Sequence, residues 1–311
     1  MSRAILVAHA RDSIARGSKS FRTASRLFDP VTRERAWLLY AWCRACDDIA
    51  DGQDHGGTMR ATDDPLARLA DIRARTDKAL GGDARIEDPA FAGLAVVAAE
   101  CAMPRRYMDD LIDGFALDAQ GWRPQSEEDL LRYCYHVAGA VGCMMAIVMG
   151  VAPDDDATLD RACDLGLAFQ LANIARDVAE DAAAGRCYLP ADWLTQAGID
   201  PADPMAPTTR AALAGVTQRT AALAARYEES ARRGTPALPY RSAWAVLAAA
   251  GIYGGIARHV AADPAAALAH RVYTSKWEKL GWLLRAAAQS AGRAGRYPTA
   301  PRATDLWRRP A

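Results

Sequence analysis

Apolar residues recur at helical spacing along most of the chain, while the alternating pattern of β-strands is nearly absent. Clusters of Gly, Pro and Asp separate the helical stretches. A helix is expected from Pro30 to about Asp51, with Asp29 as its N-cap. Further helices are expected at 66–80, 87–101, 104–119, 127–150, 157–183, 210–232, 240–261 and 273–292. The clearest linker-like segment, 196–209, is short, so the pattern predicts one all-α domain over residues 1–311 that ends in a surface tail, 297–311.

The stretch at residues 134–151 is compatible with two structures. Its length is near the lower limit for a membrane-spanning helix, but it contains His136 and follows the charged sequence EEDLLRY. A helix buried on all sides within a large α-helical domain shows the same pattern, and we favour this interpretation. The small residues on it would then leave room for a neighbouring helix or for a ligand: Ala138, Gly139, Ala140 and Gly142.

Composition and charge exclude some classes of protein. The 311 residues include 38 Lys or Arg and 38 Asp or Glu, so the net charge is zero, whereas a nucleic-acid-binding protein needs an excess of basic residues. The seven cysteines are scattered and odd in number, which favours a reducing compartment over a disulfide framework. Cys43 and Cys46 form a lone C-x-x-C without a second pair, which is typical of ordinary helix cysteines.

Two stripes of oxygen-bearing side chains follow apolar runs in the predicted helices. In YAWCRACDDIAD, Asp47 and Asp51 are four residues apart, so they share a helix face with Arg44 and with Tyr40 one turn further back. The second stripe lies in AFQLANIARDVAED and consists of Gln170, Asn173, Asp177 and Asp181.

Each stripe alone could be an ordinary solvated helix face. The apolar residues that precede both stripes argue for buried helices, in which carboxylates are costly unless they are paired or bind metal. Magnesium prefers oxygen ligands and commonly binds one or two carboxylates together with substrate phosphates. Two such stripes that face each other across a cavity would hold several Mg²⁺ ions with a diphosphate between them, and Arg44 would contact phosphate oxygens.

The motifs CRACDDIAD and QLANIARDVAEDAAAGRCYLP resemble the two aspartate motifs of the squalene/phytoene synthase family. GSKSFRTASRLFD, LRYCYHVAGAVGCMM, ACDLGLAFQLANIARD and GRCYLPADWL match the family in the same order, most closely its bacterial phytoene synthases. The resemblance implies an isoprenoid-synthase-type helical bundle with a central cavity. It also implies a prenyltransferase of carotenoid biosynthesis that joins two geranylgeranyl diphosphates head to head, through prephytoene diphosphate, to give 15-cis-phytoene. Mg²⁺, or alternatively Mn²⁺, would assist, and no NADPH would be needed.

The resemblance also implies roles for individual residues. The metal ligands would be Asp47, Asp51, Asn173, Asp177 and Asp181. Tyr40 and Tyr133 would lie near the reacting carbons, where aromatic faces stabilise a carbocation. Substrate contacts would come from Ser18, Ser20, Phe21, Arg44, Asp118, Val137, Gly142, Gln170, Asn173 and Arg271. The proton acceptor is open, with the released diphosphate as one candidate.

Three other functions compete with this one. A thirty-carbon dehydrosqualene or squalene-type synthase would use farnesyl diphosphate, and a squalene product would also require NADPH. A chain-elongating prenyltransferase would explain DDIAD but should have an arginine pair soon after it, where GQDHGGTM stands. A non-catalytic helical membrane or binding protein would leave both carboxylate stripes unexplained.

The expected substrate is a lipid with a charged head, and the expected product is a hydrocarbon. We therefore expect a cytoplasmic protein that touches the membrane surface peripherally and does not span it. Prenyl diphosphates and this lipid surface are the expected partners, and nucleic acid is not.

Overall fold

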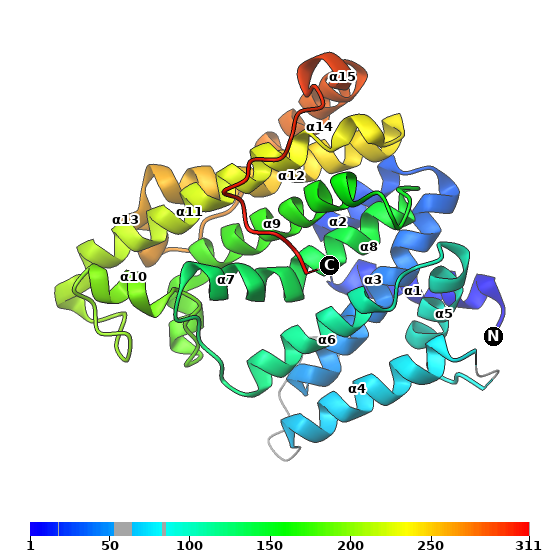
Figure 1. Cartoon of the computed structure of the whole chain (residues 1–311), viewed down its shortest axis with the longest axis horizontal. Helices are drawn as coiled ribbons and strands as arrows, with labels where there is room; N and C mark the ends of the chain where they lie inside the picture. The colour runs from blue at the N-terminus through cyan, green and yellow to red at the C-terminus, as the bar shows by residue number, and fades with distance from the viewer. Residues whose placement is uncertain (18, 53–63, 83–84, 311) are drawn as a thin grey trace. The chain divides into compact units, whose positions relative to one another are not determined.

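The structure, a computed structural model, describes residues 1–17, 19–52, 64–82 and 85–310 (Figure 1). Helices make up the regular structure of these residues, and none of them lies in a strand. The predicted all-α class is therefore confirmed. The chain divides into two compact units, residues 1–120 with 144–156 and residues 121–143 with 157–311. The expectation of a single domain stays a prediction.

The first unit contains the helices α1 to α6. They are α1 (Arg3–Gly17), α2 (Lys19–Ala24), α3 (Pro30–Asp51), α4 (Pro65–Leu80), α5 (Pro89–Glu100) and α6 (Arg106–Ala119). Helix α3 packs against α1, α4, α5 and α6, and its Trp42 is fully buried. Three of these helices begin with Asp-Pro, where the aspartate caps backbone N–H groups and the proline supplies helical backbone geometry: α3, α4 and α5. The predicted start of α3 is confirmed.

The second unit begins with α7 (Glu127–Cys134), which continues into a π-helical turn (Tyr135–Gly139) and then into α8 (Ala140–Val148). Helix α8 belongs to the second unit up to residue 143 and to the first unit from residue 144. Helix α9 (Asp156–Ala183) follows and is buried along most of its length. The remaining helices are α10 (Ala191–Gln196), α11 (Arg210–Arg232), α12 (Tyr240–Ala262), α13 (Pro264–Ala269), α14 (Lys276–Ala291) and α15 (Arg293–Arg296). Helix α12 lies between α11 and α14 and packs against both (Figure 1).

Two helical segments of the described residues have the length and hydropathy of a membrane span, Glu127–Val148 and Tyr240–Ala262. In their most apolar windows, 61% and 56% of the residues are buried inside the protein. The burial of the first segment fits the interpretation of residues 134–151 as a core helix.

The C-terminal segment packs more closely than the predicted surface tail. Arg302 forms a bidentate ion pair with Asp164 of α9, whose side chain is fully buried. Leu306 is buried, and Trp307 packs against Tyr135 with 5.5 Å between ring centroids. Most other residues after 297 are exposed. The surface tail stays a prediction, and these contacts were not expected, because an arginine-rich composition does not reveal a buried carboxylate partner far away in the sequence.

Candidate functional site

The first acidic cluster lies in the last two turns of α3. Arg44 pairs with two carboxylates, Nη1 with Asp47 at 2.8 Å and Nη2 with Asp48 at 2.7 Å. Asp51 is the last residue of the helix, and Gly52 ends the helix in the left-handed conformation. The helix therefore places Asp47, Asp51 and Arg44 along one face, as their spacing predicts.

Negative charge accumulates around Asp47. Burial raises the pKa of its carboxyl to about 6, and the charge of Asp51 adds to the effect. Asp48 and Asp118 raise the pKa further, while Arg44 lowers it. The influence of Asp118 places this sequence-predicted residue near the cluster. A bound cation would relieve the repulsion among these oxygens, so the donor set fits a hard divalent metal ion.

Tyr40 stands one helical turn before Arg44. Its ring stacks on Phe21 of α2, with 5.0 Å between the centroids and 15° between the planes. A Cβ at Gly17 would lie 2.5 Å from the Tyr40 hydroxyl oxygen, so glycine permits this close approach. Phe21 of α2 and Tyr40 of α3 thus form an aromatic stack, and Tyr40 stands on the same helix as the first acidic cluster.

The second acidic cluster lies on α9, which is continuous through all its members. Asn173, Asp177 and Asp181 are half-buried and follow one another at four-residue intervals on one helix face. Two arginines bind Asp177: Nε of Arg176 donates to it at 2.7 Å, and Arg271 contacts it at 3.2 Å. Arg271 also pairs with Glu180. Arg271 therefore reaches the second acidic cluster.

Sequence reasoning missed Arg176 and Tyr253. The positive charge of Arg176 acts on Tyr253 of α12, whose ring stacks on Phe169 at 4.3 Å, and burial raises the pKa of the Tyr253 hydroxyl. The available signal was an arginine directly after the apolar run LGLAFQLANIA and directly before Asp177, since a cation beside a buried helix face needs a partner.

Tyr133 lies in an aromatic stack. Its ring is between Trp122 and Tyr188, with centroid distances of 5.7 and 4.9 Å. Val137 lies in the π-helical turn that begins two residues after Tyr133. Such turns are uncommon and occur frequently at functional sites. The position of Tyr133 near reacting carbons stays a prediction.

The small residues of the 134–151 stretch make room for a helix. A Cβ at Gly142 would lie 2.4 Å from the carbonyl oxygen of Ala162 on α9. A Cβ at Gly166 of α9 would in turn lie 2.3 Å from the carbonyl oxygen of Ala138. The two backbones therefore touch, so helix packing explains these glycines, and the channel-lining role of Gly142 stays a prediction.

The structure brings together several of the predicted residues within each unit. Arg44, Asp47, Asp51 and Asp118 gather in the first unit, and Asp177 and Arg271 in the second. The convergence of the two clusters stays a prediction, as do the roles of Gln170 and Asn173. Ser18 and the side chain of Ser20 lie outside the described residues.

The sequence matches the family described as squalene/phytoene synthase over residues 14–278. The chain belongs to this family. It is 48% identical to a phytoene synthase of Pseudescherichia vulneris, with both chains covered completely. It is 45% identical to a 15-cis-phytoene synthase of Pantoea ananas, again over the full length of both. A crystal structure of a dehydrosqualene synthase in complex with ligand superimposes with a TM-score of 0.80, at 25% identity, over 93% of this chain and 98% of that one.

Membership of the squalene/phytoene synthase family confirms the predicted family and the predicted class of enzyme, a prenyltransferase. The fold agrees, since the solved relatives are squalene and dehydrosqualene synthases. The family match supports neither a chain-elongating prenyltransferase nor a non-catalytic protein. It also accounts for a diphosphate-binding site that uses a divalent metal.

Proposed function

We propose that the protein is a 15-cis-phytoene synthase that condenses two geranylgeranyl diphosphates head to head in carotenoid biosynthesis. The observation that carries the proposal is the match to relatives named phytoene synthase, at 45–48% identity along the whole chain. One substrate would lose its diphosphate, the double bond of the other would attack the resulting allylic cation, and loss of a proton would close the cyclopropane of prephytoene diphosphate. Loss of the second diphosphate, rearrangement and a second proton loss would then give phytoene.

The two acidic clusters would hold the divalent ions, which we propose are Mg²⁺ or alternatively Mn²⁺. Asp47 and Asp51 would bind them from α3, and Asn173, Asp177 and Asp181 from α9. When bound, such ions neutralise the charge that develops on a departing diphosphate. Burial is the main cause of the raised pKa of Asp47, and the neighbouring charge of Asp51 adds to it. A bound cation would relieve this repulsion, which supports the assignment.

The arginines of the two clusters would bind the diphosphate groups. Arg176 and Arg271 now pair with Asp177, and their fork-shaped donor groups can bind phosphate oxygens in its place. In the first cluster, Arg44 pairs with Asp47 in the same way and can also bind phosphate oxygens. Other contacts to the substrate head would come from Ser18, Ser20, Asp118, Gln170 and Asn173.

The aromatic residues would serve the hydrocarbon end of the substrate. Loss of diphosphate leaves an allylic cation, which the ring faces of Tyr40 and Tyr133 would stabilise. Burial raises the pKa of the Tyr40 hydroxyl, so this residue stays neutral at physiological pH. Phe21, Val137 and Gly142 would lie along the hydrocarbon, and the released diphosphate would accept the proton.

The alternative is a thirty-carbon synthase that uses farnesyl diphosphate, and the structural match to a dehydrosqualene synthase favours it. Incubation of the pure protein with Mg²⁺ and either prenyl diphosphate, without NADPH, tests both functions. Mass spectrometry of the extracted hydrocarbon should find phytoene from geranylgeranyl diphosphate. A thirty-carbon product alone would favour the alternative. The absence of any hydrocarbon, both without NADPH and in a second incubation with NADPH, would refute both.

We further propose that the enzyme works in the cytoplasm at the membrane surface. Its substrate carries a charged head on a long apolar chain, and its product is fully apolar. Both partition into lipid, so a peripherally bound enzyme can collect one and release the other.

A further inference from the structure

Helix α14 and the loop before it expose large apolar side chains. The exposed fractions are 82% for Trp277, 67% for Leu284, 47% for Leu280 and 70% for Tyr273. Four of the nine exposed large apolar residues of the described chain lie in this one segment. Large apolar side chains that gather on a surface mark contact with another molecule, whereas single ones are normal.

The apolar residues of α14 form one stripe. Successive residues of a helix are rotated by about 100°, so the i, i+3 and i+7 positions share a face. Trp277, Leu280 and Leu284 have this spacing, and the exposed small residues Ala288 and Ala291 continue it. Ala286, Gln289 and Ser290 lie on the opposite face and are buried against the rest of the unit.

Basic residues border this stripe on both sides. At about 100° per residue, Arg285 falls on one edge and Lys276 on the other. Residues 273–296 contain five Lys or Arg and one Glu, a net charge of +4 in a chain whose net charge is zero. The region that exposes the apolar stripe is thus also strongly positive, which complements an anionic surface.

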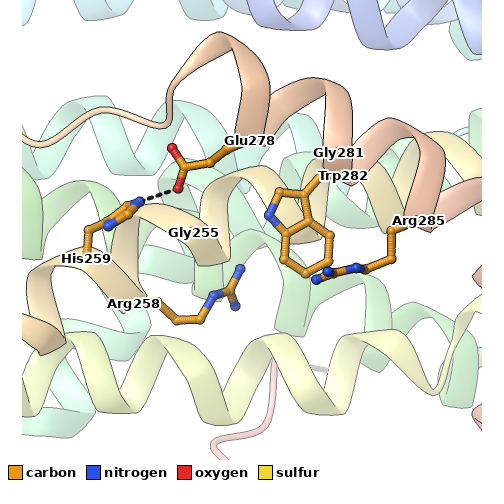
Figure 2. Close-up of a pocket in the computed structure, with 7 residues that line it drawn as sticks. All are labelled: Gly255, Arg258, His259, Glu278, Gly281, Trp282 and Arg285. Carbon is orange, nitrogen blue, oxygen red and sulfur yellow. Dashed lines mark hydrogen bonds and ion pairs between the residues drawn. The ribbon is translucent and has the colours of Figure 1, made fainter.

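A pocket of about 410 Å³ opens beside the stripe, between α12 and α14 (Figure 2). Trp282 lies at its centre, with the guanidinium carbons of Arg258 and Arg285 at 5.1 and 4.8 Å from its ring centroid. His259 and Glu278 interact at 2.7 Å and line another part of the pocket. Arg258 also pairs with Glu228 at 3.1 Å and donates to the carbonyl oxygen of Gly251, but its side chain remains 47% exposed. Together with the exposed Arg285 it favours an anionic group of the size of a phosphate.

We propose that α14 is the surface by which the protein docks on a bilayer that contains anionic phospholipids. The stripe of Trp277, Leu280 and Leu284 inserts below the headgroups, and the pocket beside it receives a lipid phosphate between Arg258 and Arg285. An apolar stripe with a tryptophan and basic borders is the composition of helices that lie in the membrane interface. This inference rests on the proposed function, since a prenyl lipid substrate that resides in such a bilayer gives the enzyme a reason to bind there.

Vesicle sedimentation tests the proposal with the full-length protein. The wild type should bind vesicles of phosphatidylcholine with 30% phosphatidylglycerol, and more weakly at high salt. The double variant Trp277→Ser with Leu284→Gln should lose about 100-fold or more in vesicle affinity, because it removes two large inserted side chains. Leu66→Gln is the matched control: Leu66 is 57% exposed on α4, and its replacement should leave vesicle binding unchanged.

The pocket has a separate test. Arg285→Gln should weaken binding to the phosphatidylglycerol vesicles by about 5-fold, the effect of one basic residue near a membrane surface, and should hardly change binding to pure phosphatidylcholine. Thermal unfolding should be nearly the same for all variants, because the replaced side chains are exposed. The proposal is overturned if the wild type does not bind anionic vesicles, if the double variant binds them as well as the wild type, or if Arg285→Gln changes nothing.

A detergent assay separates this inference from the proposed function. With geranylgeranyl diphosphate in detergent micelles, the double variant should release diphosphate at the wild-type rate. If the wild type binds vesicles but releases no diphosphate, the proposed function fails and the docking surface stands. If the wild type is active in detergent but binds no vesicles, the docking surface fails and the function stands.

Discussion

Replacement of Gly166 by alanine should push α9 away from residues 138–139, whose backbone it contacts. The added Cβ would lie 2.3 Å from the carbonyl oxygen of Ala138, 2.6 Å from its carbonyl carbon and 2.7 Å from the Cα of Gly139. All three neighbours are backbone atoms, so no side-chain rotation can relieve the overlap. Overpacking of this kind costs about 1–3 kcal/mol, and alanine recovers about 1 kcal/mol of helix propensity. Because the neighbours are rigid, we expect a net loss of about 2 kcal/mol of unfolding free energy.

Gly215→Ala is the matched control. Gly215 lies in the middle of α11, is exposed, and a Cβ there would have no neighbour within 4 Å. The same substitution should therefore stabilise the protein by about 0.5–1 kcal/mol through helix propensity alone. The two variants thus make the same chemical change but are expected to shift stability in opposite directions.

Urea unfolding, followed by tryptophan fluorescence and by circular dichroism, measures the difference. Both probes are needed because two compact units can unfold separately. At about 2–4 °C per kcal/mol, Gly166→Ala should also melt about 4–8 °C below the wild type. A melting temperature at or above that of the wild type would show that α9 does not approach residues 138–139 this closely, and the packing account would fail.

Three further predictions concern the site and the ion pairs. Asp177→Asn should lower the rate of diphosphate release by about 100-fold or more while the protein stays folded. The control Asp305→Asn changes an exposed aspartate and should release diphosphate at nearly the wild-type rate. A near-normal rate for Asp177→Asn would refute the role of Asp177. Asp164→Asn should lower the free energy of unfolding by about 3 kcal/mol, because it leaves the partly buried Arg302 without its ion-pair partner. The control Asp305→Asn removes an exposed ion pair and should cost less than about 1 kcal/mol. Equal losses of unfolding free energy in urea denaturation would contradict this. Hydrogen bonds from Ser275 and His259 lower the pKa of the Glu278 carboxyl from 4.5 to about 2. The contribution of Glu278 to stability is therefore complete above pH 4.5 and is lost as the pH falls towards 2. A pKa near 4.5 in an NMR titration would exclude these hydrogen bonds.

Local signals in the sequence predicted most of the long helices. The Asp-Pro pairs at the start of α3, α4 and α5 are capping signals that act within four residues. Helix α11 has the bounds that its periodicity predicts, 210–232. Helix α14 was predicted from 273 but begins at 276, because Ser275 and Glu278 form a capping box there.

Features that depend on distant partners could not be predicted. The π-helical turn at Tyr135–Gly139 sits in a stretch whose apolar pattern is that of an ordinary helix. The C-terminal segment is held by Arg302, whose partner Asp164 is 138 residues away. The pair of Arg271 and Glu180 spans 91 residues. Periodicity identifies which face of a helix is polar, but not which other polar group will meet it.

We propose that Asp47 and Asp51 of α3 and Asp177 and Asp181 of α9 bind divalent ions around the same diphosphate. Anomalous X-ray diffraction from crystals grown with Mn²⁺ and an unreactive thiolodiphosphate analogue of the substrate would locate these ions. We expect manganese peaks within bonding distance of carboxylates from both pairs, with the analogue between them. Peaks bound to one pair alone, or the two pairs on separate surfaces with no shared ion, would contradict it.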